Sequence, residues 1–407
     1  MTISSLAEHY VRLVLELGLY DEDFVDAYYG PEEWRPSSAK QSAFPADDFL
    51  KRTTEFAIAL REISLSPDGE ERFRCHSLAK QLIALDARIR FLSGTKYTFD
   101  EESRLLYDAV APHYDEEHFK RLLTSLDSLL PGTTSISEKL DAFRKSFVIP
   151  VERLDAVFSA AIAEGKRRTL DHIALPPEEK FSVEYVTGKP WSGYNWYRGN
   201  CYSVIQVNTD FPILIDRAVD LACHEGYPGH HVFNMLMEKN LVRGKGWMEF
   251  SVYPLFSPLS LIAEGSANFG IEMALPEKER IEFEKGTLFP IAGLDAERTE
   301  EYYAVQKLIT KLHYAGNEAA RGYLDGVLDK GAAIEWLVTY AMFEPKRAVQ
   351  RIAFFEKYRS YVINYNLGLD LVRASIENRG GTLDHPAVRW KLFEELLSLP
   401  PTPGSLS

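Results

Sequence analysis

The segment HEGYPGHH, residues 224–231, carries the residue types that a metal hydrolase needs. Imidazoles bind ions such as zinc, and a glutamate beside the first imidazole can take a proton from the attacking water. His224 and Glu225 form such a pair, and His230 and His231 follow His224 by six and seven residues. In an unbroken helix, six residues rise about 9 Å and rotate by roughly 240°, and seven lie two turns apart. The segment can therefore hold one ion only if the helix breaks.

Pro228 and Gly229 stand where that break is needed. Proline removes the amide that would bond the carbonyl of His224 and clashes with that carbonyl, while glycine permits unusual dihedral angles. We therefore expect a bulged or broken turn that brings His230 back beside His224. Two questions stay open: whether His230 or His231 is the second ligand, and whether the segment is only a helix end with solvated histidines.

A third ligand is expected from LSLIAEGSANFGIEMALP, residues 259–276. Glu264 follows an apolar run there, and a charge on an apolar face is costly unless it is paired or bound to a metal. Small residues surround it and let two helices approach closely: Gly265, Ser266, Ala267 and Gly270. We predict that His224, His230 and Glu264 hold zinc, with Glu225 as the general base. Glu272 could accept a hydrogen bond from one of these metal ligands and so orient it. In the alternative, Glu264 only caps a helix or forms a salt bridge.

A hydrolase of this kind also needs a hydrogen-bond donor for the oxyanion that forms on the scissile carbonyl. Tyr365, Tyr361 and His313 are the candidates, in that order, and Tyr361 is also a candidate for binding substrate. Each could instead be a packed or surface ring. Arg321 could bind a substrate carboxylate with two parallel hydrogen bonds, or form a salt bridge with Asp325.

The elements that must position these residues are predicted to be mostly helices. Apolar residues recur at three- and four-residue spacing in three segments, residues 3–19, 46–63 and 70–92. Ser135 with Glu138 forms a capping box, and Pro150 suits the first turn of the next helix. Between residues 181 and 208, FSVEYV and CYSVIQVN predict short strands. We predict a mainly α fold, a large helical protein with a small β hairpin or sheet beside the metal-binding helix.

The chain of 407 residues is long enough for one large domain or several. We predict a helical N-terminal region, residues 1–175, and a catalytic metal-binding region, residues 176–407, and we leave open that they form one continuous domain. The strand predicted at residues 201–208 leads directly into the His224 helix. At a sheet edge its free backbone groups could pair with an extended peptide; otherwise it only packs.

The formal net charge of −14 argues against nucleic acid and anionic membranes as partners. It also disfavours strongly acidic substrates, unless a local basic pocket overrules it. Three cysteines, Cys75, Cys201 and Cys223, are too few and too far apart to indicate a disulfide framework, and Cys223 is expected to be a buried apolar residue. No apolar run approaches the roughly 20 residues of a membrane span. We therefore expect a cytoplasmic protein whose oligomeric state stays open.

The motif HEGYPGHH followed by AEGSANFGIE resembles the Domain of Unknown Function 885 family, whose zinc-peptidase-like members pair HExxPGHH with a downstream EGxA motif. Arg321 with Asp325 is similar to the Arg-x₃-Asp helix of that family, and YNLG, residues 365–368, is similar to its YxxG segment. The resemblance covers about residues 190 to 375. Its first two motifs are specific and the later two are weak.

The resemblance implies a largely helical protein in which His224 and His230 bind the metal, Glu264 is the third ligand and Glu225 is the general base. The chain also departs from the family pattern. Asp329 stands where a histidine is expected, and RSYVIN replaces a PGQA-like stretch before YNLG. These departures leave the oxyanion donor and the substrate range open.

Together these patterns predict a zinc-dependent hydrolase, a metallopeptidase that cleaves a peptide or a small amide. Two alternatives stay open. Two histidines and a carboxylate also bind non-haem iron, although Glu225 would then have no role. The chain could also be a non-enzymatic helical scaffold with a vestigial metal site.

Overall fold

The fold is given by a computed structural model that describes residues 2–37, 40, 42–64, 69–189 and 191–406. The helices of the first half are α1 (Ile3–Leu17), α2 (Ala46–Ile63), α3 (Gly69–Leu92), α4 (Phe99–Tyr107), α5 (Glu116–Leu129), α6 (Ile136–Lys145) and α7 (Leu154–Leu170). The next helices are α8 (Asp216–Leu221), α9 (His230–Met237), α10 (Pro258–Ala274), α11 (Glu277–Phe283), α12 (Phe289–Ala292) and α13 (Thr299–Lys311). The last are α14 (Tyr314–Leu324), α15 (Lys330–Tyr340), α16 (Pro345–Tyr358), α17 (Ile363–Asn378) and α18 (Pro386–Ser398). The predicted mainly α fold is confirmed.

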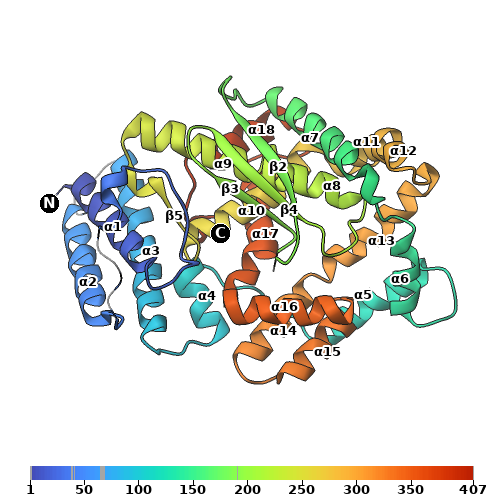
Figure 1. Ribbon diagram of the computed structural model, residues 1–407, viewed down its shortest axis with the longest axis horizontal. Helices are drawn as coiled ribbons and strands as arrows, with labels where there is room; N and C mark the ends of the chain where they lie inside the picture. The colour runs from blue at the N-terminus through green and yellow to red at the C-terminus, as the bar shows by residue number, and fades with distance from the viewer. Residues whose placement is uncertain (1, 38–39, 41, 65–68, 190, 407) are drawn as a thin grey trace.

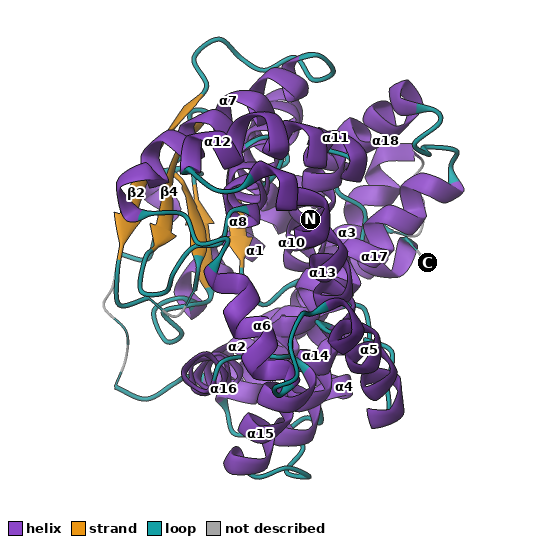
Figure 2. Ribbon diagram, turned by 90° about the vertical axis from the view of Figure 1, so that its right-hand side faces the viewer, coloured by secondary structure: helices purple, strands orange, loops and turns teal. Residues whose placement is uncertain are grey.

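Two small sheets accompany the helices. Their strands are β1 (Val25–Tyr28), β2 (Lys180–Val186), β3 (Gly193–Tyr197), β4 (Tyr202–Asn208) and β5 (Val252–Pro254). The two predicted strands are β2 and β4, which pair in parallel and so do not form a hairpin. Strand β3, which was not predicted, pairs with β4 in antiparallel fashion, giving the order β2-β4-β3 of a small sheet. The second sheet pairs β1 with β5 in antiparallel fashion and was not predicted from the sequence. Figure 2 shows the strands gathered on one side of the helical body.

The local patterns placed the helices well. Helix α2 has the predicted bounds, α3 begins one residue earlier, and α1 ends two residues before the predicted end. Ser135 and Glu138 form the predicted capping box at α6. Pro150 does not lie in a first helical turn; it precedes a short 3₁₀ turn, Val151–Arg153, before α7 begins.

Helix α10 lies at the middle of the molecule, packed against α17 (Figure 1). It is apolar on almost every side and buried nearly throughout, as expected for a core helix. Its contact with α17 is close because glycines meet: a Cβ on Gly265 would lie 2.4 Å from backbone atoms of Gly368. A Cβ on Gly368 would in turn lie 2.7 Å from the carbonyl oxygen of Leu261. The predicted close helix approach at Gly265 is confirmed, and its partner is α17.

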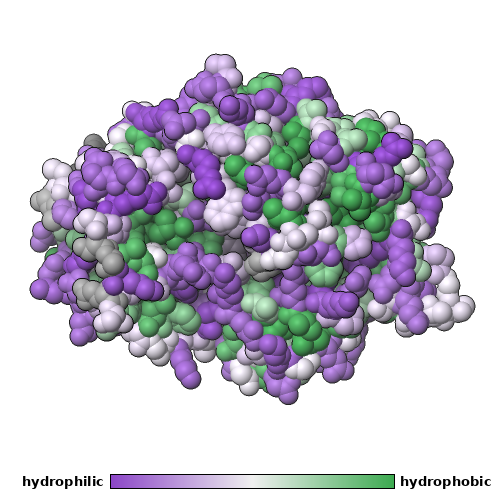
Figure 3. Space-filling model, viewed as in Figure 1, coloured by the Kyte–Doolittle hydropathy of each residue, from purple (hydrophilic) through white to green (hydrophobic). Residues whose placement is uncertain are grey.

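Residues of both predicted regions belong to one hydrophobic cluster, from Leu6 in α1 to Phe393 in α18. Strands β1 and β5 also pair across the boundary proposed near residue 175, which stays a prediction. Hydrophilic side chains cover much of the face shown in Figure 3, with smaller hydrophobic patches between them. None of the helices within the described residues is long and apolar enough to cross a membrane.

Candidate metal centre

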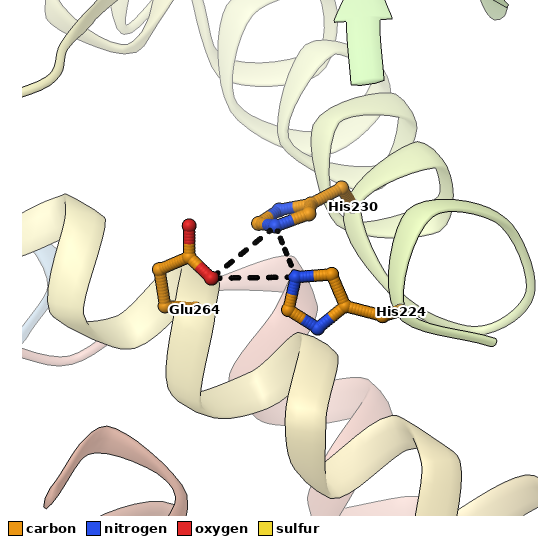
Figure 4. Close-up of side chains that lie close together, drawn as sticks. All are labelled: His224, His230 and Glu264. Atoms are coloured by element: carbon orange, nitrogen blue, oxygen red, sulfur yellow. Dashed lines mark hydrogen bonds and ion pairs between the residues drawn. The ribbon is translucent and has the colours of Figure 1, made fainter. Parts of the chain in front are cut away.

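The three side chains predicted as metal ligands lie together in the core. His224 Nε2 lies 3.2 Å from His230 Nε2, and Glu264 Oε2 lies 3.3 Å from His224 Nε2 and 3.7 Å from His230 Nε2. Figure 4 shows these three side chains pointing toward one another, the histidines from one stretch of chain and Glu264 from α10. A tetrahedral ion with bonds of about 2.1 Å sets its ligand atoms roughly 3.4 Å apart. The observed separations bracket that value.

The predicted helix break makes this geometry possible. Helix α8 runs on into a π-helical turn, Ala222–Gly226, and α9 begins only at His230. Within the break the Gly229 amide donates to the Cys223 carbonyl at 2.9 Å. A Cβ on Gly229 would lie 1.9 Å from the His224 carbonyl oxygen, so only glycine fits there. The expectation that His230 returns beside His224 is confirmed.

Asn268 orients the first histidine, a role that sequence reasoning missed. Its Nδ2 donates to the backbone oxygen of Tyr365 at 2.9 Å, so its Oδ1 is left to accept from Nδ1 of His224 at 3.0 Å. This bond places the ring proton on Nδ1 and leaves Nε2 with a free lone pair facing the other two side chains. The available signal was spacing, since Asn268 follows Glu264 by one helical turn on α10.

The two oxygens of Glu264 have different environments. Oε1 accepts a hydrogen bond from the Tyr361 hydroxyl at 2.8 Å. Oε2 is buried and has no hydrogen-bond donor among the described residues. Burial raises the pKa of Glu264, but His224 and His230 outweigh that effect and hold it below the ordinary value. A charged, buried oxygen without a donor, facing two imidazoles, matches the requirement of a cation site.

Glu225 is buried beside the three predicted ligands and is held by the sheet. Asn195 of β3 donates to its backbone oxygen at 2.7 Å, and a Cβ on Gly193 would lie 2.9 Å from Oε1. Burial raises the pKa of Glu225; the histidines lower it and Glu264 raises it. Strand β3 therefore has the positioning role, because its glycine leaves room for the carboxylate.

The proposal that the strand at 201–208 pairs with a peptide is wrong. Strand β4 is the middle strand of its sheet, with β2 on one side and β3 on the other. Its backbone groups are already used in both ladders, so they cannot accept a further strand.

His231 belongs to a different cluster. Its Nδ1 lies 2.8 Å from Ser203 Oγ, and its Nε2 lies 3.0 Å from Glu179 Oε2. The Tyr227 hydroxyl also donates to Glu179 Oε2 at 2.7 Å, and Lys166 Nζ lies 2.6 Å from Glu179 Oε1. We name these five residues the Glu179 cluster. Of the two candidate second ligands, the structure places His230 at the candidate metal centre and His231 in this cluster.

The predicted oxyanion donors differ in their surroundings. Tyr361 is occupied by Glu264, and its ring lies 5.8 Å from the ring of Tyr365. The Tyr365 hydroxyl has no hydrogen-bond partner among the described residues. Burial and the charge of Glu264 raise its pKa, and Glu225 raises it further, so Tyr365 faces the same site. The pKa of His313 is instead lowered, by desolvation and by the cations of Arg217 and Arg351.

Arg321 is engaged by protein groups rather than open to substrate. Nε lies 3.0 Å from Asp100 Oδ1, Nη1 pairs with Glu318 Oε1, and Nη2 donates to the Ala111 carbonyl. The suggested salt bridge to Asp325 is wrong, because Asp325 Oδ1 accepts from the Phe99 amide at the start of α4. A carboxylate ligand would have to displace existing partners of Arg321.

Three further residues singled out in the sequence have other contacts. Glu272 forms an ion pair with Arg373 of α17 instead of supporting a predicted ligand. Asp329 caps α15 by accepting from the Ala332 amide at 2.8 Å. Cys223 is a buried free thiol whose pKa burial raises to about 12, in agreement with the expectation of an apolar residue.

Asp26 of β1 is a residue near the site that the sequence did not indicate. It accepts a hydrogen bond from the Tyr194 hydroxyl. Burial raises the pKa of Asp26 to about 7; His230 lowers it, and Glu264 raises it. No local motif marks Asp26, because β1 reaches the site by pairing with β5, more than 200 residues away in the chain.

No family model matches this chain, and no curated protein sequence matches it. Similar folds occur among solved structures. One is a protein from Colwellia psychrerythraea described as "the putative lipoprotein", with a TM-score of 0.54 and 15% identity, covering 92% of this chain and 69% of that one. Another is BsuCP, with a TM-score of 0.49 and 12% identity, covering 97% and 87%. A third, "a putative lipoprotein of unknown function" from Shewanella oneidensis, has a TM-score of 0.46 and 12% identity, covering 89% and 72%. At this identity the first likeness concerns the fold alone.

Proposed function

We propose that this chain is a zinc-dependent hydrolase that cleaves peptide or amide bonds. The candidate metal centre supports this proposal most, because two imidazole nitrogens converge on a buried carboxylate oxygen for which the described part of the chain offers no hydrogen-bond donor. Glu225 lies directly after the first histidine and is buried beside them. The resemblance of both motifs to the Domain of Unknown Function 885 family supports the same class.

The donor set fits zinc. His224, His230 and Glu264 would hold the ion, and three protein ligands leave a fourth position open, as in catalytic zinc sites. When bound there, zinc supplies a Lewis acid that polarises a carbonyl and lowers the pKa of water. Asn268 contributes by keeping the His224 proton on the nitrogen that faces away from the ion.

Glu225 is the residue to which we assign proton transfer. As water attacks the carbonyl carbon, a C–O bond forms and the Glu225 carboxylate accepts a proton from the water. Glu225 then donates this proton to the amide nitrogen, and the C–N bond breaks to give an acid and an amine. Gly193 leaves room for this carboxylate beside β3, because a Cβ there would lie 2.9 Å from Oε1.

We assign the oxyanion donor to Tyr365. Its hydroxyl has no other partner in the described ranges of the chain, and its backbone oxygen accepts a hydrogen bond from Asn268, the partner of His224. Tyr361 has a different task, because its hydroxyl holds Oε1 of Glu264 and orients the other oxygen toward the histidines.

The test is the substitution Glu225→Gln in purified protein, with zinc measured by mass spectrometry and activity measured on a peptide library. We expect about one zinc per chain in both proteins and a loss of activity of roughly 10²- to 10⁴-fold in the variant. Glu282→Gln, on the exposed side of α11, is the matched control and should keep full activity.

Full activity of the Glu225→Gln protein, or activity that a chelator does not remove, would contradict the proposal. Iron in place of zinc after anaerobic purification would instead support the non-haem iron alternative.

A further inference from the structure

Five basic residues come from four parts of the chain, and one of them, Arg351, lies against the ring of Tyr365 beside the candidate metal centre. We name them the basic cluster: Arg144 of α6, Arg217 of α8, His313 before α14, and Arg347 and Arg351 of α16. Arg347 and Arg351 are one helical turn apart, so they share a face of α16. The Arg347 guanidinium lies 5.4 Å from the ring of Phe211, in the loop after β4, so this face looks toward the sheet. The cluster stands out in a chain of net charge −14.

The charges of this cluster influence one another. Desolvation lowers the pKa of His313, and the cations of Arg217 and Arg351 lower it further. Burial likewise lowers the pKa of Arg351; Tyr365 partly offsets the fall, and the Arg347 cation adds to it. The contacts of Arg144 and Arg347 lie near the start of α16: Arg144 Nη1 donates to the Met342 carbonyl at 3.1 Å, and Arg347 lies beside Phe211.

Most of these cations lack acidic partners. Arg217 forms a salt bridge with Asp220 at 2.9 Å, but Arg144, Arg347 and Arg351 form none among the described residues. Nε of Arg351 is buried with no acceptor in the part of the chain that is described. A guanidinium in this state is costly unless an anion completes it.

The planar shape of Arg351 indicates how that anion would bind. Its guanidinium lies 4.5 Å from the ring centre of Phe354 and 5.4 Å from that of Phe355. Aromatic rings stabilise the flat faces of the cation, yet they accept none of its in-plane N–H bonds. The edge of the guanidinium therefore keeps the fork that pairs with two carboxylate oxygens.

A short chain of contacts joins Arg351 to the candidate metal centre. The guanidinium lies 5.9 Å from the ring centre of Tyr365, whose backbone oxygen accepts from Asn268, the partner of His224. An anion held by Arg351 would thus be separated from the reacting bond by the ring of Tyr365.

We propose that Arg351 of the basic cluster binds a carboxylate of the substrate. This inference rests on the proposed hydrolase function and names its substrate class: a peptide or amide with an acidic group close to the scissile bond. The carboxylate comes either from the end of the substrate chain or from an acidic side chain. Arg351 is the specificity-determining residue, because it supplies a bidentate donor that no group within the described residues uses.

Matched substrates test the proposal on zinc-loaded protein. One pair of peptides differs only in a free carboxylate or a carboxamide at the C-terminus, and a second pair differs in glutamate or glutamine beside the cleaved bond. We expect kcat/KM to fall roughly 10- to 100-fold when the recognised carboxylate is neutralised. The pair that shows the fall identifies the source of the carboxylate. Equal cleavage within both pairs would overturn the proposal.

Arg351→Gln should lower kcat/KM on the acidic substrate by the same factor and leave its neutral counterpart nearly unchanged. Arg351→Lys should retain part of the preference, because it keeps the charge and loses the fork. Lys346→Gln removes a charge from the exposed side of the same helix and should change neither substrate. An equal fall of Arg351→Gln on both substrates would overturn the proposal.

A binding measurement separates this inference from the hydrolase function. Calorimetry with N-acetylglycine and N-acetylglycinamide needs no turnover, and we expect the wild-type protein to prefer the carboxylate and the Arg351→Gln protein to lose that preference. If no peptide is cleaved but this preference is found, the carboxylate site stands and the hydrolase proposal fails. If binding is the same with and without Arg351, in a variant with unchanged melting temperature, the carboxylate site fails.

Discussion

Two buried glutamates, Glu179 and Glu264, contact histidines of the segment at residues 224–231. Their neighbours are of the same types, but their hydrogen bonding differs. Glu264 accepts from the Tyr361 hydroxyl, and Glu179 accepts from the Tyr227 hydroxyl, at 2.8 and 2.7 Å. Each also faces histidine. In the Glu179 cluster, however, both carboxylate oxygens have donors, whereas Oε2 of Glu264 has none among the described residues.

The adjacent histidines show the same contrast. His231 uses both ring nitrogens on protein partners, while His230 presents Nε2 to His224 and Glu264. Successive residues of a helix point about 100° apart, so neighbours in the motif enter different clusters. The comparison teaches that residue type does not separate a structural cluster from a candidate site. The separating feature is an unused lone pair on a buried atom.

The largest effect that would sharpen this contrast is expected for Glu264→Gln. Glutamine keeps the shape but removes the charge, so we expect zinc affinity and activity to fall by roughly a thousandfold or more. Zinc competition with a chelator measures the loss of affinity. A variant that binds zinc as tightly as wild type would contradict the role of Glu264 as a zinc ligand.

The matching substitution Glu179→Gln should lower stability and leave zinc affinity unchanged. It leaves Lys166 and His231 without their anionic partner, so we expect the free energy of unfolding to fall by about 2–3 kcal/mol while zinc binding is kept. Urea unfolding at neutral pH measures the loss. Loss of zinc without loss of stability would contradict the structural role.

The loss caused by Glu179→Gln should also depend on pH. Burial raises the pKa of Glu179, but hydrogen bonds from His231, Lys166 and Tyr227 outweigh it and lower the pKa from 4.5 to about 2. A lowered carboxyl pKa stabilises the fold above pH 4.5, and this stabilisation is lost as the pH falls toward 2. The difference between wild type and variant should therefore shrink over that range. A constant difference would show that charge is not its source.

A smaller effect is expected for Asn268→Ala. Without the amide, His224 can rotate or carry its proton on the wrong nitrogen, so we expect zinc affinity to fall roughly 10- to 100-fold. Ser203→Ala removes the corresponding partner of His231 and is the matched control, with unchanged zinc affinity. Equal effects of the two substitutions on zinc would show that Asn268 has no special role.

Local patterns explain what could be predicted from the sequence. The bounds of α2 follow from apolar spacing within 18 residues, and the break before His230 follows from Pro228 and Gly229. Glu264 could be chosen because it is a charge within an apolar run. Each of these signals lies within one or two turns of the residue concerned.

What could not be predicted depends on distant pairings. Asp26 reaches the site only through the β1–β5 sheet, and Glu179 meets His231 across more than 50 residues. The spacing of Arg321 and Asp325 suggested a salt bridge, yet both residues bind partners near residue 100. The basic cluster comes from four elements, so no stretch of sequence marks it.

The contact between Gly265 and Gly368 has a consequence for any attempt to graft this site onto another scaffold. Gly265 directly follows Glu264, and Gly368 lies three residues after Tyr365, so the crossing of α10 and α17 sets how far the carboxylate lies from the tyrosines. The two short motifs EG and YNLG thus meet at one helix crossing. A transplant that copied every polar side chain but allowed a methyl group at either glycine would move one helix away from the other. Gly265 and Gly368 take no part in the chemistry, but a graft would have to include them together with the reactive side chains.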